Sequence, residues 1–204
     1  MPHWEPNASQ RLADAALGLF EERGYGDTTV LDIATRAGLA KSTFFRHYRD
    51  KREVLFDEDA LTGVFVDAIT AAPAEAAPLE AIAHALDALG RDVFTPASRA
   101  FTVRRQAVVD ANPDLQERET LKLAGLTAAL ARSLAQRGLP DLTARATAEL
   151  GVLAFKAAYE RWNRPNGVEE FGVVARQALD EVQAAALATG ERPDRSGEHD
   201  GSEA

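Results

Sequence analysis

Two short helical patterns joined by a glycine constrain the fold of this chain more than any other part of its sequence. The stretch from Thr29 to Lys51 reads TVLDIATRAGLAKSTFFRHYRDK. Thr29 followed three residues later by Asp32 matches a helix capping box, and apolar residues then keep i, i+3, i+4, i+7 spacing until Gly38. Because glycine permits the positive φ of a tight turn, the pattern predicts a helix-turn-helix whose second helix spans 41–48.

The rest of the chain also follows a helical period, and no segment alternates convincingly as a strand. Besides a first helix that ends before Gly24, further helices are expected at about 52–71, 79–93, 98–111, 113–137, 143–163 and 167–188. The sequence therefore predicts an all-α protein. Its expected parts are an N-terminal three-helix domain (1–56), a linking fourth helix (about 52–71), a C-terminal helical bundle (57–189) and a disordered tail (190–204).

Composition excludes several classes of protein. The chain has no cysteine, so no disulfide, thiolate metal site or cysteine nucleophile is expected. No apolar run approaches the roughly 20 residues that span a bilayer, and the first residues lack the order of a signal peptide. We therefore expect a cytoplasmic protein with no membrane partner.

The net charge of −9 is distributed unevenly along the chain. Residues 1–56 carry equal numbers of basic and acidic side chains, so the acidity lies entirely in residues 57–204. Between Arg36 and Arg52 there are six basic residues and one acid, Asp50. A basic patch on an acidic body is typical of a protein that contacts phosphates at one end only.

The predicted helix over 41–48 has two faces of different chemistry. Phe44 and Tyr48 lie four residues apart and are expected to face inward. The outward face carries cations, hydroxyls and one aromatic ring: Lys41, Ser42, Thr43, Phe45, Arg46 and His47. Cations and hydroxyls bind phosphate oxygens, and some of these side chains can also read base edges in a major groove. The sequence therefore predicts contact with double-stranded DNA through this helix.

A longer pattern runs from Arg11 to Phe56. It comprises Phe20-x-x-x-Gly24-Tyr25, then Thr28-Thr29-Val30-x-x-Ile33-Ala34-x-x-Ala37-Gly38-Leu39-Ala40-Lys41-Ser42-Thr43-Phe44-Phe45-Arg46-His47-Tyr48-x-x-Lys51-x-x-Leu55-Phe56. This pattern resembles the N-terminal domain of the TetR family of bacterial transcriptional regulators. The resemblance implies an operator-binding homodimer whose all-α C-terminal domain binds a small molecule.

The resemblance also implies roles for individual residues. Those expected to hold phosphates are Thr29, Thr43, His47 and Lys51, the last at the start of the fourth helix. Those expected to read bases are Lys41, Ser42 and Arg46. The family commonly has a tyrosine where this chain has Phe45, so one hydrogen bond to the DNA backbone is expected to be missing.

The C-terminal half offers candidates for an effector pocket. Aromatic side chains that could line it for an apolar or aromatic effector are Phe65, Phe94, Phe101, Phe155, Tyr159 and Trp162. Aromatic residues at helical spacing are also typical of an ordinary core. Arg104 and Arg105 are adjacent, so one of them must lie near the buried face. That arginine could bind an anionic ligand, or it could pair with an acid such as Asp87 or Glu119. Arg104 is included among the pocket residues because of the first alternative.

The last two predicted helices carry a wide stripe of apolar and small residues. Its members are Leu150, Leu153, Ala154, Ala157, Phe171, Val174, Ala175, Ala178, Leu179 and Val182. Such a stripe favours a four-helix dimer interface about a two-fold axis, and packing within one subunit is the alternative.

The favoured function is a ligand-responsive repressor that a small molecule releases from a near-palindromic operator. A transcriptional activator of the same fold is one alternative, and an enzyme with a helical C-terminal domain is another. No HExxH motif or Gly-rich phosphate loop is present, and the four histidines are scattered. We therefore expect no catalytic residue, no metal site and no cofactor.

Overall fold

The computed structural model describes residues 8–56, 58–164 and 168–188, and within them it is built from α-helices and one short 3-10 helix, without strands. The elements are α1 (Ala8–Arg23), α2 (Val30–Arg36), α3 (Lys41–His47), η1 (Glu53–Leu55), α4 (Glu58–Ala71), α5 (Pro78–Asp92), α6 (Arg99–Asp110), α7 (Pro113–Gln136), α8 (Asp141–Trp162) and α9 (Phe171–Ala188). The predicted all-α fold is confirmed. The tail expected at 190–204 lies outside the described residues.

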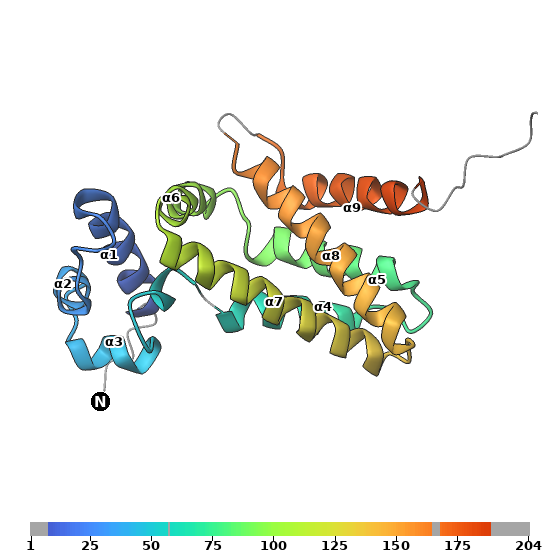
Figure 1. Cartoon of the computed structure of the whole chain (residues 1–204), viewed down its shortest axis with the longest axis horizontal. Helices are drawn as coiled ribbons and strands as arrows, with labels where there is room; N and C mark the ends of the chain where they lie inside the picture. Colours follow the sequence, from blue (N-terminus) through green and yellow to red (C-terminus); the bar gives the residue numbers. More distant parts are fainter. Residues whose placement is uncertain (1–7, 57, 165–167, 189–204) are drawn as a thin grey trace, which may run out of the picture.

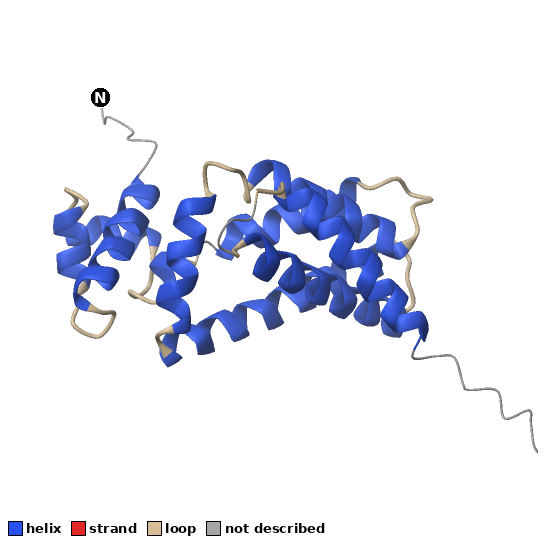
Figure 2. Cartoon of the chain, turned by 90° about the horizontal axis from the view of Figure 1, so that it is seen from above, coloured by secondary structure: helices blue, strands red, loops and turns tan. Residues whose placement is uncertain are grey.

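The helices fall into two groups. Figure 1 shows α1, α2 and α3 gathered at one end and α4, α5, α7, α8 and α9 bundled at the other. Helix α6 stands between the groups, and α7 runs from it into the bundle; the view from above shows the same division (Figure 2). None of the described helices is long and apolar enough to cross a membrane.

Each group has its own hydrophobic cluster. The N-terminal cluster joins buried side chains of α1, α2, α3 and η1 to Val108, Val109 and Leu115 from the end of α6 and the start of α7. The C-terminal cluster is formed by α4, α5, α7, α8 and α9. Helix α6 contributes to the N-terminal cluster, and the chain then continues through α7 into the bundle. Together, these two helices therefore connect the two clusters.

The predicted fourth helix begins later than expected. Residues 53–55 form the 3-10 helix η1, Phe56 is extended with φ −129° and ψ 101°, and α4 starts at Glu58. The interruption has a packing cause, because Phe56 is buried in the N-terminal cluster and turns the chain there. Lys51 therefore lies before a break and not on the helix that enters the bundle.

The last helix also begins later than expected. It was placed at 167–188, but 168–170 are not helical and α9 starts at Phe171. Residues 165–167 lie outside the described part of the chain.

Most of the predicted dimer stripe is interior to the subunit. Six of its members are buried by the subunit itself: Ala154, Phe171, Val174, Ala175, Ala178 and Leu179. Helix α9 packs against both α5 and α8, and a Cβ built on Gly90 of α5 would come within 2.8 Å of the Gly172 nitrogen. The small residues therefore allow close approach within one subunit, and the part that these six take in a dimer interface stays a prediction. Leu153 stays exposed, while Leu150, Ala157 and Val182 are half-buried.

Candidate nucleic-acid interface

The turn between α2 and α3 fixes the direction of α3. Gly38 has φ +68°, which L side chains rarely adopt, and a Cβ there would lie 3.0 Å from Arg11 Nη2. The same Arg11 nitrogen donates to the Ala37 carbonyl at 2.6 Å, and the Leu39 amide donates to the Ala34 carbonyl at 2.9 Å. Helix α1 thus holds the end of α2, and α3 leaves the turn in a defined direction.

Helix α3 buries the two aromatic residues that the sequence placed inward. Phe44 is fully buried and Tyr48 is 9% exposed. The Tyr48 hydroxyl lies 2.6 Å from Ser9 Oγ of α1, so a hydrogen bond as well as packing holds the end of α3. The predicted core role of both residues is confirmed.

The opposite face of α3 brings the predicted contact residues together on one surface. Lys41, Ser42, Phe45, Arg46 and His47 are exposed and Thr43 is half-buried. Arg46 Nη2 donates to Thr43 Oγ1 at 2.9 Å, and Lys41 Nζ lies 5.9 Å from the centre of the Phe45 ring. The surface therefore combines cations, hydroxyls and an apolar ring, a set that suits both phosphate oxygens and base edges.

Thr29 forms the capping box expected from its spacing to Asp32. Its backbone amide and its hydroxyl both donate to Asp32 Oδ2, at 2.9 and 2.6 Å, and the Asp32 amide donates to Thr29 Oγ1 at 3.2 Å. The hydrogen bond from the Thr29 side chain, followed by that from its amide, lowers the pKa of Asp32. A phosphate contact by the Thr29 hydroxyl stays a prediction, and it requires the hydroxyl proton to turn away from Asp32.

Lys51, whose expected phosphate contact stays a prediction, makes hydrogen bonds within the subunit. Its ammonium donates to the carbonyls of Tyr25, Gly26 and Thr28 at 2.7, 3.3 and 3.0 Å, and it lies 4.2 Å from the centre of the Tyr25 ring. These three bonds match the three protons of an ammonium group. Lys51 thus ties the loop between α1 and α2 to the segment after α3, and it is not free to bind phosphate unless these bonds break.

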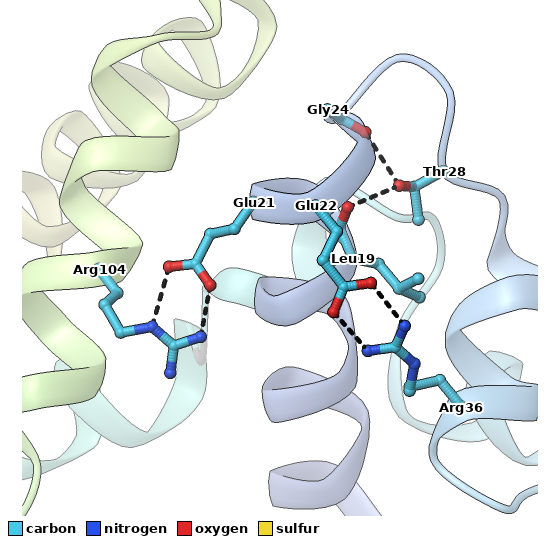
Figure 3. Close-up of polar contacts among 7 residues, drawn as sticks. All are labelled: Leu19, Glu21, Glu22, Gly24, Thr28, Arg36 and Arg104. Carbon is cyan, nitrogen blue, oxygen red and sulfur yellow. Dashed lines mark hydrogen bonds and ion pairs between the residues drawn. The ribbon is translucent and has the colours of Figure 1, made fainter.

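Two bidentate ion pairs flank α1 (Figure 3). Glu22 accepts both hydrogen bonds from Arg36 of α2, and Glu21 accepts from Arg104 of α6 at 2.9 Å through Nε and 2.5 Å through Nη2. These hydrogen bonds lower the pKa of each glutamate. The Arg104 pair joins residues 83 apart in sequence, and it links α1 to α6.

The adjacent arginines of α6 therefore take separate partners. Arg104 faces α1 and does not reach the bundle interior, so its inclusion in the effector pocket was wrong. Phe101 packs against the N-terminal cluster, so it too was misplaced. Arg105 pairs with Glu119 at 3.1 Å, which is the ion-pair alternative considered from the sequence.

The remaining pocket candidates form an aromatic cluster in the bundle. Ring contacts join Phe65, Phe94, Phe155, Tyr159 and Trp162 to one another and to Phe171, a member of the predicted dimer stripe. Phe94 and Phe171 are stacked with centres 4.5 Å apart. Phe94 and Trp162 also line a cavity of about 560 Å³, whereas Phe65, Phe155 and Tyr159 do not. Aromatic spacing had identified the cluster but not which rings reach open space.

Comparison with known proteins agrees with this geometry. Residues 12–57 match the family described as bacterial regulatory proteins, tetR family. The chain is 30% identical over 194 residues to the HTH-type transcriptional regulator TcmR of Streptomyces glaucescens, which covers 90% of this chain and 86% of that protein.

Solved structures with lower identity share the fold. Thermus thermophilus FadR, described as a repressor in complex with lauroyl-CoA, is 22% identical with a TM-score of 0.53 over 93% of this chain and 100% of that one. A transcriptional regulator from Rhodococcus sp. Rha1 is 19% identical with a TM-score of 0.52 over 89% of this chain and 96% of that one. The helix-turn-helix with its basic outer face, the helical bundle behind it and the match to TcmR lead to one conclusion: this chain belongs to the TetR family of DNA-binding transcriptional regulators.

Proposed function

We propose that this regulator is a homodimeric repressor that places two copies of α3 in successive major grooves of a near-palindromic operator and leaves it when a small molecule binds. The exposed face of α3 carries the proposal. In it, Lys41, Ser42 and Arg46 read bases, while Thr43 and His47 hold phosphates. Thr29 adds a phosphate contact at the start of α2, where the backbone amides of a helix N-terminus favour an anion.

The effector in this proposal binds in the part of the chain after residue 56. The cavity beside the aromatic cluster has Phe94 and Trp162 in its wall, and charged residues such as Arg91, Arg99 and Glu170 also line it. An effector with an apolar or aromatic body and a polar end fits such a wall. The complex of Thermus thermophilus FadR with lauroyl-CoA is an example of a ligand of that kind on this fold.

Release from DNA requires the effector to favour a subunit arrangement that the operator binds poorly. A hundredfold loss of operator affinity corresponds to a coupling free energy of about 2.7 kcal/mol. By the reciprocity of linkage, the operator must weaken effector binding by the same factor.

A titration with DNA from upstream of the regulator's own gene and neighbouring genes tests the proposal. Fluorescence anisotropy at about 150 mM salt should find one segment bound at about 10⁻⁸ M or tighter, at least a thousandfold better than random DNA of equal length. Equal affinity for all segments at matched salt would overturn specific operator binding. A reporter gene behind the bound segment then separates repression from activation, because deletion of the regulator raises expression only if it represses.

Replacing Phe45 with tyrosine should tighten DNA binding. The ring is 51% exposed, so a hydroxyl adds at its edge without disturbing the core, and it supplies a donor for a phosphate oxygen. One added hydrogen bond of about 1 kcal/mol predicts roughly fivefold higher affinity. The gain should be equal for operator and random DNA, because a backbone contact carries no sequence information. Unchanged affinity, or a changed order of preferred operators, would show that α3 meets the DNA in another orientation.

A further inference from the structure

Three of the six basic side chains between Arg36 and Arg52 are bound, in the described part of the chain, to carboxylates or backbone carbonyls of their own subunit. Arg36 makes its bidentate ion pair with Glu22. Arg52 donates to Asp50 through Nε at 3.0 Å and Nη2 at 2.7 Å, and Lys51 donates to three backbone carbonyls. The other three are Lys41, Arg46 and Arg49. The first two already belong to the face of α3 proposed to read bases, whereas Arg49 has no role in that proposal.

Arg49 follows α3 on the outer side of the chain. The backbone is extended at Tyr48, with φ −137° and ψ 140°, and successive side chains of an extended chain point to opposite sides. Because Tyr48 is buried, Arg49 is directed outward and is exposed, as is His47 before it. The Arg49 guanidinium makes no hydrogen bond or ion pair with any described residue. Its charge is therefore available beside the outer face of α3.

The two acids within four residues of Arg49 each have an arginine partner. Asp50 accepts from Arg52, and Glu53 accepts from Arg118 of α7 at 2.9 Å. Because each carboxylate is offset by its own cation, neither neutralises Arg49, and the segment stays attractive to an anion. A guanidinium matches the geometry of a phosphate group and can bind it through two parallel hydrogen bonds.

Glu53 fixes the backbone from which Arg49 projects. Its Oε2 accepts from the Arg49 backbone amide at 2.7 Å, while its Oε1 accepts from Arg118 Nη2. The Glu53 and Arg118 side chains are only 17% and 25% exposed, and they join residues 65 apart in sequence. Helix α7 runs from its first turns into the bundle (Figure 1). One carboxylate thus attaches the residue after Tyr48 to the helix that enters the bundle.

We propose that Arg49 is a further phosphate-binding residue of the DNA interface, and that Glu53, held by Arg118, is its positioning residue. Arg49 binds the DNA backbone next to His47, at the end of α3. It supplies the contact expected of Lys51, whose ammonium is bound to carbonyls. The inference rests on the proposed docking of α3 against DNA, and it requires neither repression nor a particular effector.

The salt dependence of DNA binding tests the Arg49 contact. Each phosphate contact adds about 0.9 to the slope of log affinity against log salt concentration, so Arg49→Ala should flatten this slope by about 0.9 for each bound subunit. At about 150 mM salt the affinity should fall roughly fivefold for each bound subunit. The loss should be equal for the operator segment and a random duplex of the same length, because phosphates carry no sequence information. Arg49→Lys keeps the charge and should keep the wild-type slope. Fluorescence anisotropy over a range of salt concentrations gives these values.

Arg52→Ala is the matched control. It removes the same kind of side chain three residues further on, but that guanidinium is bound to Asp50, so the slope should stay that of the wild type. A wild-type slope in Arg49→Ala, or equal flattening by both variants, would overturn the Arg49 contact. Arg46→Ala separates this failure from that of the docking itself. If it weakens binding while Arg49→Ala does not, only this inference fails; if neither variant changes affinity for any duplex, the docking of α3 is wrong.

Glu53→Ala tests the positioning role, because its two possible effects have opposite signs. Removal of a carboxylate near DNA would by itself tighten binding, whereas loss of the bond to the Arg49 amide should weaken it. We expect weaker binding and a flatter slope, with no further change when Arg49→Ala is added. Glu53→Gln keeps an acceptor for the amide and should keep the wild-type slope, and circular dichroism checks that each variant is folded. Tighter binding by Glu53→Ala, flattening that adds to that of Arg49→Ala, or equal flattening by Glu53→Gln would contradict the positioning role.

Discussion

Replacing Phe44 with alanine should lower the free energy of unfolding of the N-terminal helices by about 3–5 kcal/mol and abolish operator binding. Phe44 is fully buried, and its ring centre lies 5.4 Å from that of Tyr48 and 5.5 Å from that of Phe45. The truncation leaves a cavity beneath α3, so the helix loses the packing that holds its outer face in position. Urea unfolding and operator anisotropy measure the two effects separately.

The neighbouring phenylalanine is the matched control. Phe45→Ala removes the same side chain from a position that is 51% exposed, so the free energy of unfolding should change by no more than about 0.5 kcal/mol. Operator affinity should still fall, because the ring belongs to the surface proposed to meet DNA. If Phe45→Ala destabilised the protein as much as Phe44→Ala, the assignment of one ring to the core and the other to DNA contact would fail.

The sequence predicted these opposite roles because both depend on local periodicity. Phe44 and Phe45 lie about 100° apart around an α-helix, and Phe44 shares its face with Tyr48. The Thr29–Asp32 capping box is similarly local, because its atoms lie within one helical turn. Such features follow from a few neighbouring residues, and the structure confirms the buried Phe44, the exposed Phe45 and the capping box.

The errors arose where a residue's partner lies far away in the chain. A helical period shows that a face is covered, but it does not say what covers it. The sequence could not show that α5 covers α9, because the close approach of Gly90 to Gly172 leaves no sign in either helix alone. Arg104 was assigned to a pocket because its partner, Glu21, lies 83 residues earlier.

The fourth helix was wrong for a related reason. Its apolar spacing continues through Val54 and Leu55, but both side chains belong to the N-terminal cluster, whereas Phe65 and Ile69 belong to the other. One periodic stretch thus contributes side chains to both hydrophobic clusters, and the helix is interrupted between them. Periodicity alone cannot locate such a break, because each part satisfies it.

Replacing Arg105 with alanine should weaken the response to effector more than it weakens operator binding. Arg105 Nε donates to the Leu55 carbonyl at 2.8 Å, Nη1 to the Tyr159 hydroxyl at 3.1 Å and Nη2 to Glu119 at 3.1 Å, while its guanidinium lies 4.5 Å from the centre of the Phe56 ring. Burial raises the pKa of Tyr159, so its hydroxyl keeps its proton while an oxygen lone pair accepts the bond from Arg105. The Arg105 side chain thus joins Leu55 and Phe56 of the N-terminal cluster to Tyr159 of the aromatic cluster.

Loss of this side chain leaves several polar groups without their partner. The Arg105 and Glu119 side chains are only 14% and 28% exposed, so breaking the pair should cost about 2–3 kcal/mol in the free energy of unfolding. Arg104→Ala is the control, because it also removes an ion pair of α6, but a more exposed one that is worth about 1 kcal/mol or less. Urea unfolding of both variants gives the comparison.

Release from the operator by the effector should likewise be weakened more by Arg105→Ala than by Arg104→Ala. If Arg105 carries the coupling between effector and operator, its alanine variant should bind the operator within a few-fold of wild type, while release by effector falls from about a hundredfold toward a few-fold. The effector-induced loss of operator affinity in Arg105→Lys should lie between the wild-type and Arg105→Ala values. An ammonium keeps the charge but cannot reach three acceptors as the rigid, planar guanidinium does. Operator titrations with and without effector measure each value. Full release in Arg105→Ala would mean that the effector moves α3 by another route, with the Glu21–Arg104 pair between α1 and α6 the next connection to test.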